Sequence, residues 1–283
     1  MTTIISAPTR IEAWLQASEH LLEVEHDLNV ILSIDSPGSD GAAARSAGTR
    51  INAFHKAEGA DPLHTVAETI FPGWEYRHRG LRGMFDMYAK EYDVLKRGEP
   101  HRWGTYAHRL INRNTATGES VNPLGALIEK MRSEHQQKRR GTYRACYELG
   151  IAEGEYDLPL YNTVDDQGRR RGLPCLSHVS FKLYNGSVHL TAIYRSHDYR
   201  YKVPGNLLGL ARLQACVAQE VGVPIGTLVV HSTYAYVDLA KGRAALKKVL
   251  VDVRGMLVKE NTNDVAEHLR LRGPEDRPIR RKR

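Results

Sequence analysis

Residues 179–192 read VSFKLYNGSVHLTA, and this stretch decides the fold class. Apolar and polar residues alternate on both sides of Asn185-Gly186, as they do in strands that bury one face. Asn-Gly between two alternating runs is the strongest short-range signal of a two-residue hairpin turn. The sequence therefore predicts two antiparallel strands that are joined at Asn185-Gly186.

A buried helix and a third strand are predicted directly after this hairpin. Pro204-Gly205 is followed by residues 206–221, which are apolar on nearly every side, a pattern typical of a helix in the centre of a protein. Gly222 ends this helix, and residues 226–237 are rich in the β-branched residues of a strand. Residues 240–259 form a mixed amphipathic stretch that is expected to be helical. Together these patterns predict an α+β fold, a sheet covered by helices with one helix deeply buried.

The first half of the chain carries mainly helical patterns, separated by segments rich in Pro and Gly. Helices are expected at residues 11–22, 64–71, 81–95 and 123–133, a strand at 28–34 and a loop at 36–41. Pro72-Gly73 is expected to end the second of these helices. The sequence contains no internal repeat and no Pro/Ser-rich linker, so we expect one domain over residues 1–272 and a basic tail over 273–283.

The composition excludes several classes of protein. Hydrophobic residues make up 41% and charged residues 26% of the 283 positions, which is ordinary for a globular chain and not for a disordered one. No apolar run approaches the roughly 18 residues of a membrane span, and the first ten residues do not resemble a signal peptide. Cys146, Cys175 and Cys216 are too few and too scattered for a disulfide framework or a zinc site. A reducing cytoplasm is the expected compartment.

The formal net charge of +7 is concentrated at the C-terminus. Residues 277–283 carry five positive charges, and removing them lowers the net charge to +2. A terminal basic run is typically a solvated tail, and the rest of the chain has no excess of charge that would indicate nucleic acid as the partner. The run Arg169 to Arg171 is read in the same way, as a solvated loop.

Three residues close to the hairpin could form a chemical site. A cysteine is a useful nucleophile only as a thiolate, and a guanidinium close to Cys175, such as that of Arg195, would favour the thiolate. An arginine also binds phosphate through two donors. The amide of Asn206 offers one donor and one acceptor, which suits the edge of a pyrimidine ring. On these residues alone the alternative reading, a cysteine that packs as a small hydrophobic residue, stays open.

The spacing of these residues resembles the thymidylate synthase family. Pro174-Cys175 is followed after twenty residues by Arg195-Ser196-x-Asp198, and Asn206, in the sequence Pro-x-Asn, stands eight residues further on. The resemblance extends over residues 122–238, where the order is correct and no large gap is needed. It includes the hairpin and the apolar helix that follows Asn206.

Further residues upstream resemble functional positions of this family. Arg139 and Arg140 match a pair of arginines that reach across the dimer to the substrate phosphate. Glu68, in the sequence Ala-Glu-Thr-Ile-Phe, matches the catalytic glutamate, and Tyr106, in Gly-Thr-Tyr, matches the active-site tyrosine. Each also has a simpler reading, as a solvated charge pair, a surface residue and a packing aromatic. Further upstream, Arg45 or Arg50 is a candidate for a phosphate-loop arginine.

The resemblance implies a covalent mechanism in a homodimer. The Cys175 thiolate would add to carbon-6 of a pyrimidine nucleoside monophosphate, and carbon-5 would then attack a one-carbon unit from 5,10-methylenetetrahydrofolate. Glu68, with ordered water, would move the protons. Arg195 and Ser196, with the arginine pair of the neighbouring subunit, would hold the phosphate. Asn206 would read the base, and Asp198 would help to bind the ring or organise the site.

Three departures from the family pattern bear on the product. Tyr236-Val-Asp238 stands where the family has a His-x-Tyr pair that bonds the sugar, and the Asp238 carboxylate could accept hydrogen bonds from ribose hydroxyls. Trp74 and Trp103 do not occupy the positions of the folate-stacking tryptophans. The chain ends in basic residues instead of the family's apolar tail.

These departures favour a divergent hydroxymethylase of a uridylate or cytidylate nucleotide, because a more open site exposes the one-carbon adduct to water. A standard thymidylate synthase, which converts dUMP to dTMP, is the first alternative. A nucleotide-binding regulator without catalysis is the second, although binding alone would not need the Cys175 thiolate. Cys146 and Cys216 are expected in the core, and His197 and His231 have no neighbouring ligands at a spacing that indicates a metal.

Overall fold

The computed structural model describes residues 2–39, 41–90, 105–114, 119–137, 146–151 and 174–271, without the side chains of Ala89, Asn114 and residues 260–271. The helices are α1 (Arg10–Val24), α2 (Ala42–Ala57), α3 (Leu63–Glu68), α4 (Gly73–Lys90), α6 (Tyr106–Ile111), α7 (Pro123–Gln137), α8 (Val203–Val221) and α9 (Ala244–Leu271). The strands are β1 (Thr3–Ala7), β2 (His26–Ile34), β3 (Arg113–Asn114), β4 (Ser120–Val121), β5 (Glu148–Gly150), β6 (Leu176–Tyr184), β7 (Ser187–Tyr194), β8 (His197–Asp198) and β9 (Ile225–Tyr236).

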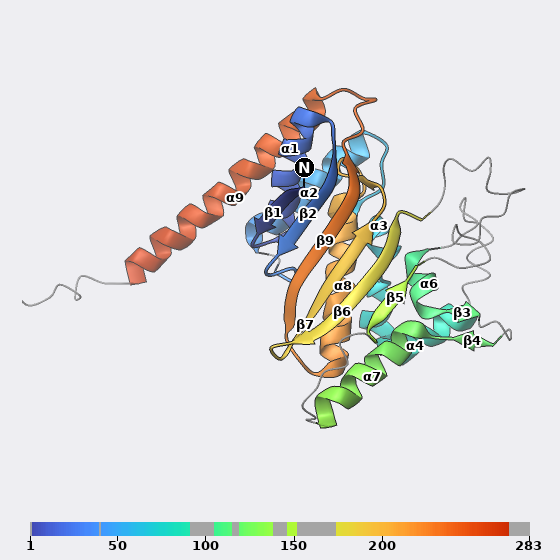
Figure 1. Cartoon of the computed structure of the whole chain (residues 1–283). Helices are drawn as coiled ribbons and strands as arrows, with labels where there is room; N and C mark the ends of the chain where they lie inside the picture. The colour runs from blue at the N-terminus through green and yellow to red at the C-terminus, as the bar shows by residue number, and fades with distance from the viewer. Residues whose placement is uncertain are drawn as a thin grey trace, which may run out of the picture.

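The main sheet is mixed, with the strand order β1-β2-β9-β7-β6-β5 and β8 paired to β9. β1 runs parallel to β2, and β7 and β8 run parallel to β9, whereas β2–β9, β5–β6 and β6–β7 are antiparallel. Helices α1 and α8 pack behind this sheet, and Figure 1 looks onto the opposite face, which no described helix covers. The architecture mixes helices with a mixed sheet and is consistent with the predicted α+β class.

The predicted hairpin is confirmed. β6 and β7 pair from Leu176 opposite Tyr194 to Tyr184 opposite Ser187, and the turn residues Asn185 and Gly186 have φ angles of 48° and 76°. Positive φ at both central residues is what this tight turn requires, and it explains the Asn-Gly pair.

The predicted central helix is also confirmed. Fourteen residues of α8 are buried, and Gly222 ends the helix in the left-handed conformation, with a φ of 83°. One buried polar side chain of α8 binds the sheet. Gln214 Nε2 donates hydrogen bonds to the carbonyl oxygens of Val188 (2.8 Å) and Gly226 (2.9 Å). Gln214 thereby connects α8 to the ends of β7 and β9.

The boundaries predicted around Pro72-Gly73 were wrong. Helix α3 already ends at Glu68, and Gly73 begins α4, which runs to Lys90 with a kink at Gly80, where φ is 67°. Strand β1 and helix α2 were not predicted, and the arginines at positions 45 and 50 lie within α2 and not in a loop. Arg50 forms an ion pair of 2.7 Å with Asp252 of α9.

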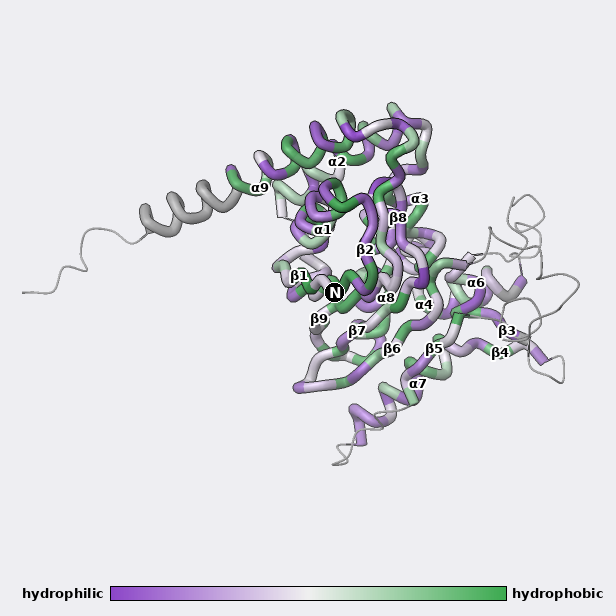
Figure 2. Tube along the Cα trace, turned by 45° about the horizontal axis from the view of Figure 1, so that its top comes forward, coloured by the Kyte–Doolittle hydropathy of each residue, from purple (hydrophilic) through white to green (hydrophobic). Residues whose placement is uncertain are grey.

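Helix α9 is amphipathic over its first half, as predicted for residues 240–259. Figure 2 shows hydrophobic and hydrophilic residues alternating along it. Leu246, Val249, Leu250 and Val253 are buried, and α9 packs on α1 and α2. Within the described residues, no helix combines the length and the apolar character that crossing a membrane would require.

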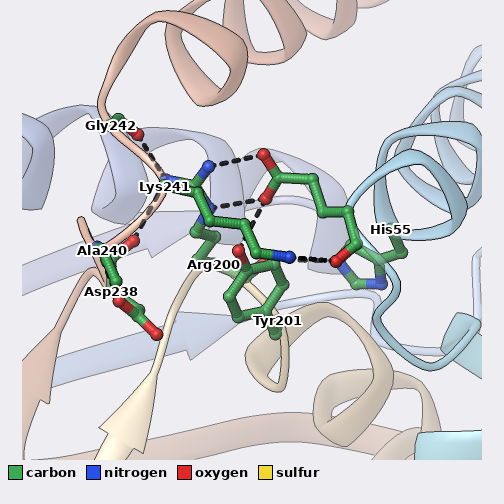
Figure 3. Close-up of polar contacts among 8 residues, drawn as sticks. His55, Arg200, Tyr201, Asp238, Ala240, Lys241 and Gly242 are labelled. Atoms are coloured by element: carbon green, nitrogen blue, oxygen red, sulfur yellow. Dashed lines mark hydrogen bonds and ion pairs between the residues drawn. The ribbon is translucent and has the colours of Figure 1, made fainter.

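A buried arginine connects three segments behind the sheet. The Arg200 guanidinium contacts Gly242 of the connection from β9 to α9 (Figure 3) and forms an ion pair with Glu58, which directly follows α2. It donates to both carboxylate oxygens of Glu58, at 2.7 and 2.9 Å, and to the carbonyl oxygens of Asp238 and Gly242. Because Arg200 is fully buried, these acceptors replace the water that its charge loses.

Two glycines let helix α3 approach α8 closely. A Cβ atom at Gly209 would lie 2.8 Å from the Ala67 carbonyl oxygen and 2.9 Å from Ile70 Cβ, and one at Gly205 would lie 2.5 Å from Val66 Cβ. Real Cβ atoms do not approach other atoms so closely, so α3 rests directly on the backbone of α8 at these glycines.

We predict that Gly209→Ala lowers the free energy of unfolding by about 1–3 kcal/mol, because the added methyl group meets backbone atoms that cannot move aside. Gly255→Ala is the matched control, since Gly255 lies on the exposed side of α9 and its Cβ would meet no atom within 4 Å. That control is expected to raise the free energy of unfolding by about 0.5–1 kcal/mol through helix propensity. Urea unfolding followed by circular dichroism measures both, and equal effects would contradict the close packing.

Candidate active site

Cys175 lies immediately before β6, where the hairpin ends. Its carbonyl oxygen accepts a hydrogen bond of 3.0 Å from the backbone N–H of Arg195, the residue that follows β7. The two residues therefore face each other across the ends of the hairpin strands. Cys175 is half-buried and Arg195 is exposed, so both residues lie at the protein surface.

The surroundings of Cys175 act on its thiol in opposite directions. Burial is the largest influence and raises the pKa of the Cys175 thiol above its ordinary value. The carboxylate of Asp198 raises this pKa further, whereas the cations of Arg195 and Lys202 lower it. The net effect is a raised pKa, so the Cys175 thiol stays protonated to a higher pH than an ordinary cysteine. Two cations that could stabilise a thiolate are nevertheless close enough to act on it.

Tyr106 supports the loop that carries the cysteine. Its hydroxyl oxygen accepts hydrogen bonds from the backbone N–H of Cys175 (3.0 Å) and of Leu176 (3.4 Å). Burial, with a smaller contribution from Cys175, raises the pKa of Tyr106 to about 12. The Tyr106 hydroxyl is therefore neutral, and it holds the backbone of Cys175 in place.

A second tyrosine close to the thiol was not predicted. Tyr194, the last residue of β7, is fully buried, and its hydroxyl has no hydrogen-bond partner within the described part of the chain. Burial raises its pKa well above the ordinary value, with contributions from Tyr106 and Cys175. The alternation of buried and partly exposed residues in β7 could have predicted that Tyr194 lies on the inner face of the sheet. It could not have predicted that Tyr194 lies close to Cys175.

Asp198 and Tyr236 pair in the short parallel ladder of β8 and β9. Asp198 Oδ1 accepts a hydrogen bond of 2.9 Å from the backbone N–H of Arg200, and burial raises the pKa of Asp198 to about 6, with a further contribution from Asp238. The pKa of Tyr236 is raised to about 12 by burial and by the neighbouring Asp198, Cys175 and Asp238. These groups therefore lie within electrostatic range of one another.

Asp238 caps the turn that follows β9. Its Oδ1 accepts a hydrogen bond of 2.9 Å from the backbone N–H of Ala240. The backbone carbonyl of Asp238 accepts from Arg200 at 3.0 Å, so both ends of the residue are held (Figure 3).

Asn206 lies in the first turn of α8 with a buried side chain. Its Nδ2 atom is 3.0 Å from Nε2 of His197, which is fully buried in β8. The sequence singled out Asn206 but indicated no role for His197. Within the described residues, no three His, Cys, Asp or Glu side chains come together in a way that could hold a metal ion.

Glu68 is bound by residues of α8 and α4. Its Oε1 accepts from Arg212 Nη1 of α8 at 2.9 Å, and its Oε2 lies 3.4 Å from the backbone N–H of Trp74. The end of α3 nevertheless adjoins the start of α6, because the N–H of Ala107, next to Tyr106, donates to the Thr69 carbonyl at 2.9 Å. Glu68 thus lies on the segment beside the Tyr106 helix, with its carboxylate bound to α8.

The remaining predicted residues add less to this cluster. Ser196 is half-buried and makes no side-chain hydrogen bond within the described residues. Cys216 is buried in α8 as predicted, whereas Cys146 is exposed and the prediction that it belongs to the core was wrong. Arg139, Arg140, Trp103 and the run Arg169 to Arg171 lie outside the described residues.

We predict that Arg195→Ala and Asp198→Asn shift the reactivity of Cys175 in opposite directions. Removing the cation raises the pKa of the thiol further, and removing the carboxylate lowers it. The measurement is the pH dependence of Cys175 alkylation by iodoacetamide, read on its peptide by mass spectrometry. Exposed Cys146 in the same sample is the internal control. Shifts in the same direction, or none, would contradict the proposed electrostatic balance.

Comparison with known proteins finds no matching family model but several related curated proteins. The chain is 40% identical over 150 residues to a protein of Methanococcoides burtonii named "Putative thymidylate synthase", a match that covers 53% of this chain and 59% of that protein. A protein of the same name from Methanosarcina acetivorans is 34% identical over 133 residues, or 47% of this chain and 52% of that protein.

A third relative, named "Deoxyuridylate hydroxymethyltransferase", comes from Bacillus phage SP01. It is 25% identical over 197 residues, which cover 67% of this chain and 47% of that protein. The chain thus spans about half the length of each of these curated relatives. These relatives confirm the resemblance of this chain to the thymidylate synthase superfamily.

Proposed function

We propose that this chain transfers a one-carbon unit to carbon-5 of a pyrimidine nucleoside monophosphate through a covalent adduct of Cys175. The observation that carries the proposal is the cluster at the end of the hairpin. It combines a half-buried thiol, a facing arginine and a half-buried carboxyl group whose pKa is raised to about 6. A nucleophile beside a phosphate-binding cation is the arrangement that such an addition needs.

In this mechanism Cys175 adds to carbon-6 of the ring, and carbon-5 becomes the nucleophile. The phosphate of the substrate binds Arg195 and Ser196. The free thiol is disfavoured as an anion by burial, so the cations of Arg195 and Lys202 carry the electrostatic stabilisation of the thiolate. Tyr106 keeps the backbone of the nucleophile in position through its two hydrogen bonds.

Asp198 and Glu68 are assigned to proton movement and organisation. A carboxyl group with a pKa near 6 can give or take a proton at neutral pH, which suits Asp198 to a role beside the ring. Glu68 acts through water, because its carboxylate is bound to Arg212.

The sugar is assigned to Tyr236 and Asp238. Tyr236 ends β9 and Asp238 follows it by two residues, and burial raises the pKa of Tyr236 to about 12, so its hydroxyl stays protonated. Tyr236 can donate a hydrogen bond to a sugar hydroxyl, and the Asp238 carboxylate, one oxygen of which already caps Ala240, can accept one. A ribose and a deoxyribose nucleotide are both compatible with this pair.

We assign the second half of the phosphate site to a neighbouring copy of the chain. Arg139 and Arg140 would reach across a homodimer, as the family resemblance implies. The sheet face that no described helix covers supports this assignment (Figure 1). Its partly exposed side chains include Ile31 of β2, Ile193 of β7 and Val229 of β9. Each of them stands between two buried residues of its strand.

The proposed one-carbon donor is 5,10-methylenetetrahydrofolate, which would supply the carbon unit when bound. Trp74 does not occupy a family tryptophan position, but the residue is 51% exposed and its backbone N–H lies 3.4 Å from the Glu68 carboxylate, so it offers an aromatic surface for a flat heterocycle of this kind. One face of the indole is stacked on His78, with ring centroids 4.2 Å apart.

The proposed product is the 5-hydroxymethyl nucleotide. The departures at Trp74 and Trp103 favour capture by water, and the name of the phage relative fits this outcome. A 5-methyl product, the reaction of a thymidylate synthase, is the second candidate, which the names of the two methanogen relatives favour.

We expect release of tritium from a 5-tritiated substrate by the parent protein, because the adduct makes the hydrogen at carbon-5 exchangeable. Cys175→Ser should lower this rate by about a thousandfold or more, since it removes the nucleophile. Cys216→Ser, at a buried thiol of α8, controls for general loss of a cysteine. Release at the parent rate by Cys175→Ser would refute the mechanism, and tight nucleotide binding without any release would indicate a regulator.

Chromatography of the products identifies the substrate and the reaction. The protein is incubated with dUMP, UMP, dCMP and CMP, each with and without methylenetetrahydrofolate. We expect a 5-hydroxymethyl product from a uridylate and none without the donor. Conversion of dUMP to dTMP with stoichiometric dihydrofolate would instead establish the thymidylate synthase reaction.

A further inference from the structure

We propose that His197 is a positioning residue that fixes the amide of Asn206 and thereby makes the site select uracil over cytosine. The inference rests on the proposed function in one respect, that Asn206 faces the edge of a pyrimidine base. His197 has no role in the mechanism described above.

The structural basis is a chain of hydrogen bonds behind the site. Asn206 Nδ2 lies 3.0 Å from His197 Nε2, and His197 Nδ1 lies 2.9 Å from Ser232 Oγ of β9. Ser232 Oγ in turn lies 3.1 Å from the hydroxyl of Tyr199. All four residues are buried, so no bulk water competes for these contacts.

His197 is a neutral ring that cannot turn. Burial lowers its pKa to about 3, so at neutral pH one ring nitrogen donates and the other accepts. The ring stacks on Tyr194, with centroids 3.8 Å apart and an interplanar angle of 5°, and Tyr199 meets its edge at 5.5 Å. A fixed ring presents one nitrogen to Asn206 and the other to Ser232.

The proposed proton arrangement follows from the identity of the facing atoms. Nδ1–H donates to Ser232 Oγ, which leaves Nε2 as an acceptor for one N–H of Asn206. The amide oxygen of Asn206 and its second N–H then remain for the ligand. The oxygen has no hydrogen-bond partner within the described residues, as expected for a ligand-binding atom.

This edge of Asn206 complements uracil. Its acceptor matches the N3–H of uracil and its donor matches O4, whereas cytosine offers an acceptor at N3 and an amine at carbon-4. With cytosine, the Asn206 acceptor would face the N3 acceptor and its donor would face the amine, so neither group would form a hydrogen bond. Hydrogen-bonded sites reject close analogues in this way. In the opposite arrangement His197 would donate to the Asn206 oxygen and only the amide N–H₂ would face the base.

The test measures Kd for dUMP and dCMP by calorimetry with the full chain. We expect the parent to bind dUMP at least about tenfold more tightly, and His197→Phe, which retains the stacking on Tyr194, to lose about tenfold of this preference. Ser232→Ala leaves Asn206 and His197 intact but no longer fixes which ring nitrogen of His197 carries the proton. This variant should therefore also lose part of the preference for dUMP over dCMP. Tyr199→Phe removes the hydroxyl at the far end of the chain and should retain the preference.

A second readout does not depend on nucleotide binding. Nitrogen NMR of histidine-labelled protein reports which ring nitrogen of His197 carries the proton, and we expect Nδ1. A proton on Nε2, or an unchanged preference in folded Ser232→Ala and His197→Phe proteins, would overturn the role of His197. Absence of binding of either nucleotide to the parent would overturn the proposed function, whatever the tautomer.

Discussion

The buried ion pair of Arg200 and Glu58 is the interaction on which the geometry of the site depends. Arg200 follows Asp198 by two residues, and its guanidinium also holds the carbonyls of Asp238 and Gly242. One side chain thus fixes the end of α2, the segment that leads into α8 and the turn after β9. Removing the Glu58 carboxylate would leave a charge in the interior, a loss of about 3–5 kcal/mol for pairs of this kind. The positions of Asp198, Asn206 and Asp238 therefore share one support.

In the candidate site, the surroundings of Cys175 and Asp198 disfavour the charged forms of both side chains. Burial raises the pKa of both Cys175 and Asp198, so the free site resists the charged forms that chemistry requires. In the proposed function, a phosphate bound beside Arg195 and a base bound beside Cys175 would change this balance. Shifted pKa values of this kind are typical of functional sites, where the rest of the fold supplies the stability that the site itself lacks.

The parts of the fold that follow from local patterns were predictable. The strict alternation around Asn185-Gly186 and the apolar run after Asn206 determine the hairpin and α8 almost alone. Helix α2 was not predicted, because its apolar stripe is interrupted by small and polar residues and its burial depends on α9. Within the site, the spacing of Cys175, Arg195 and Asn206 was informative because it resembles a known pattern. The roles of His197 and Tyr194 arise from contacts with residues of other strands and the start of α8, which one sequence does not reveal.

The packing of α3 on α8 connects the two ends of the proposed chemistry. Gly205 and Gly209 bring α3 onto the helix that begins beside Asn206, and Arg212 of the same helix binds Glu68. Arg212 follows Asn206 by six residues, which is about 9 Å along a helix. Helix α8 thus carries both Asn206 and the arginine that binds the Glu68 carboxylate of α3, at a fixed spacing. In the proposed mechanism, a proton therefore passes between Glu68 and the base through water, unless Glu68 leaves Arg212. The ion pair therefore limits Glu68 to water-mediated proton transfer as long as it persists.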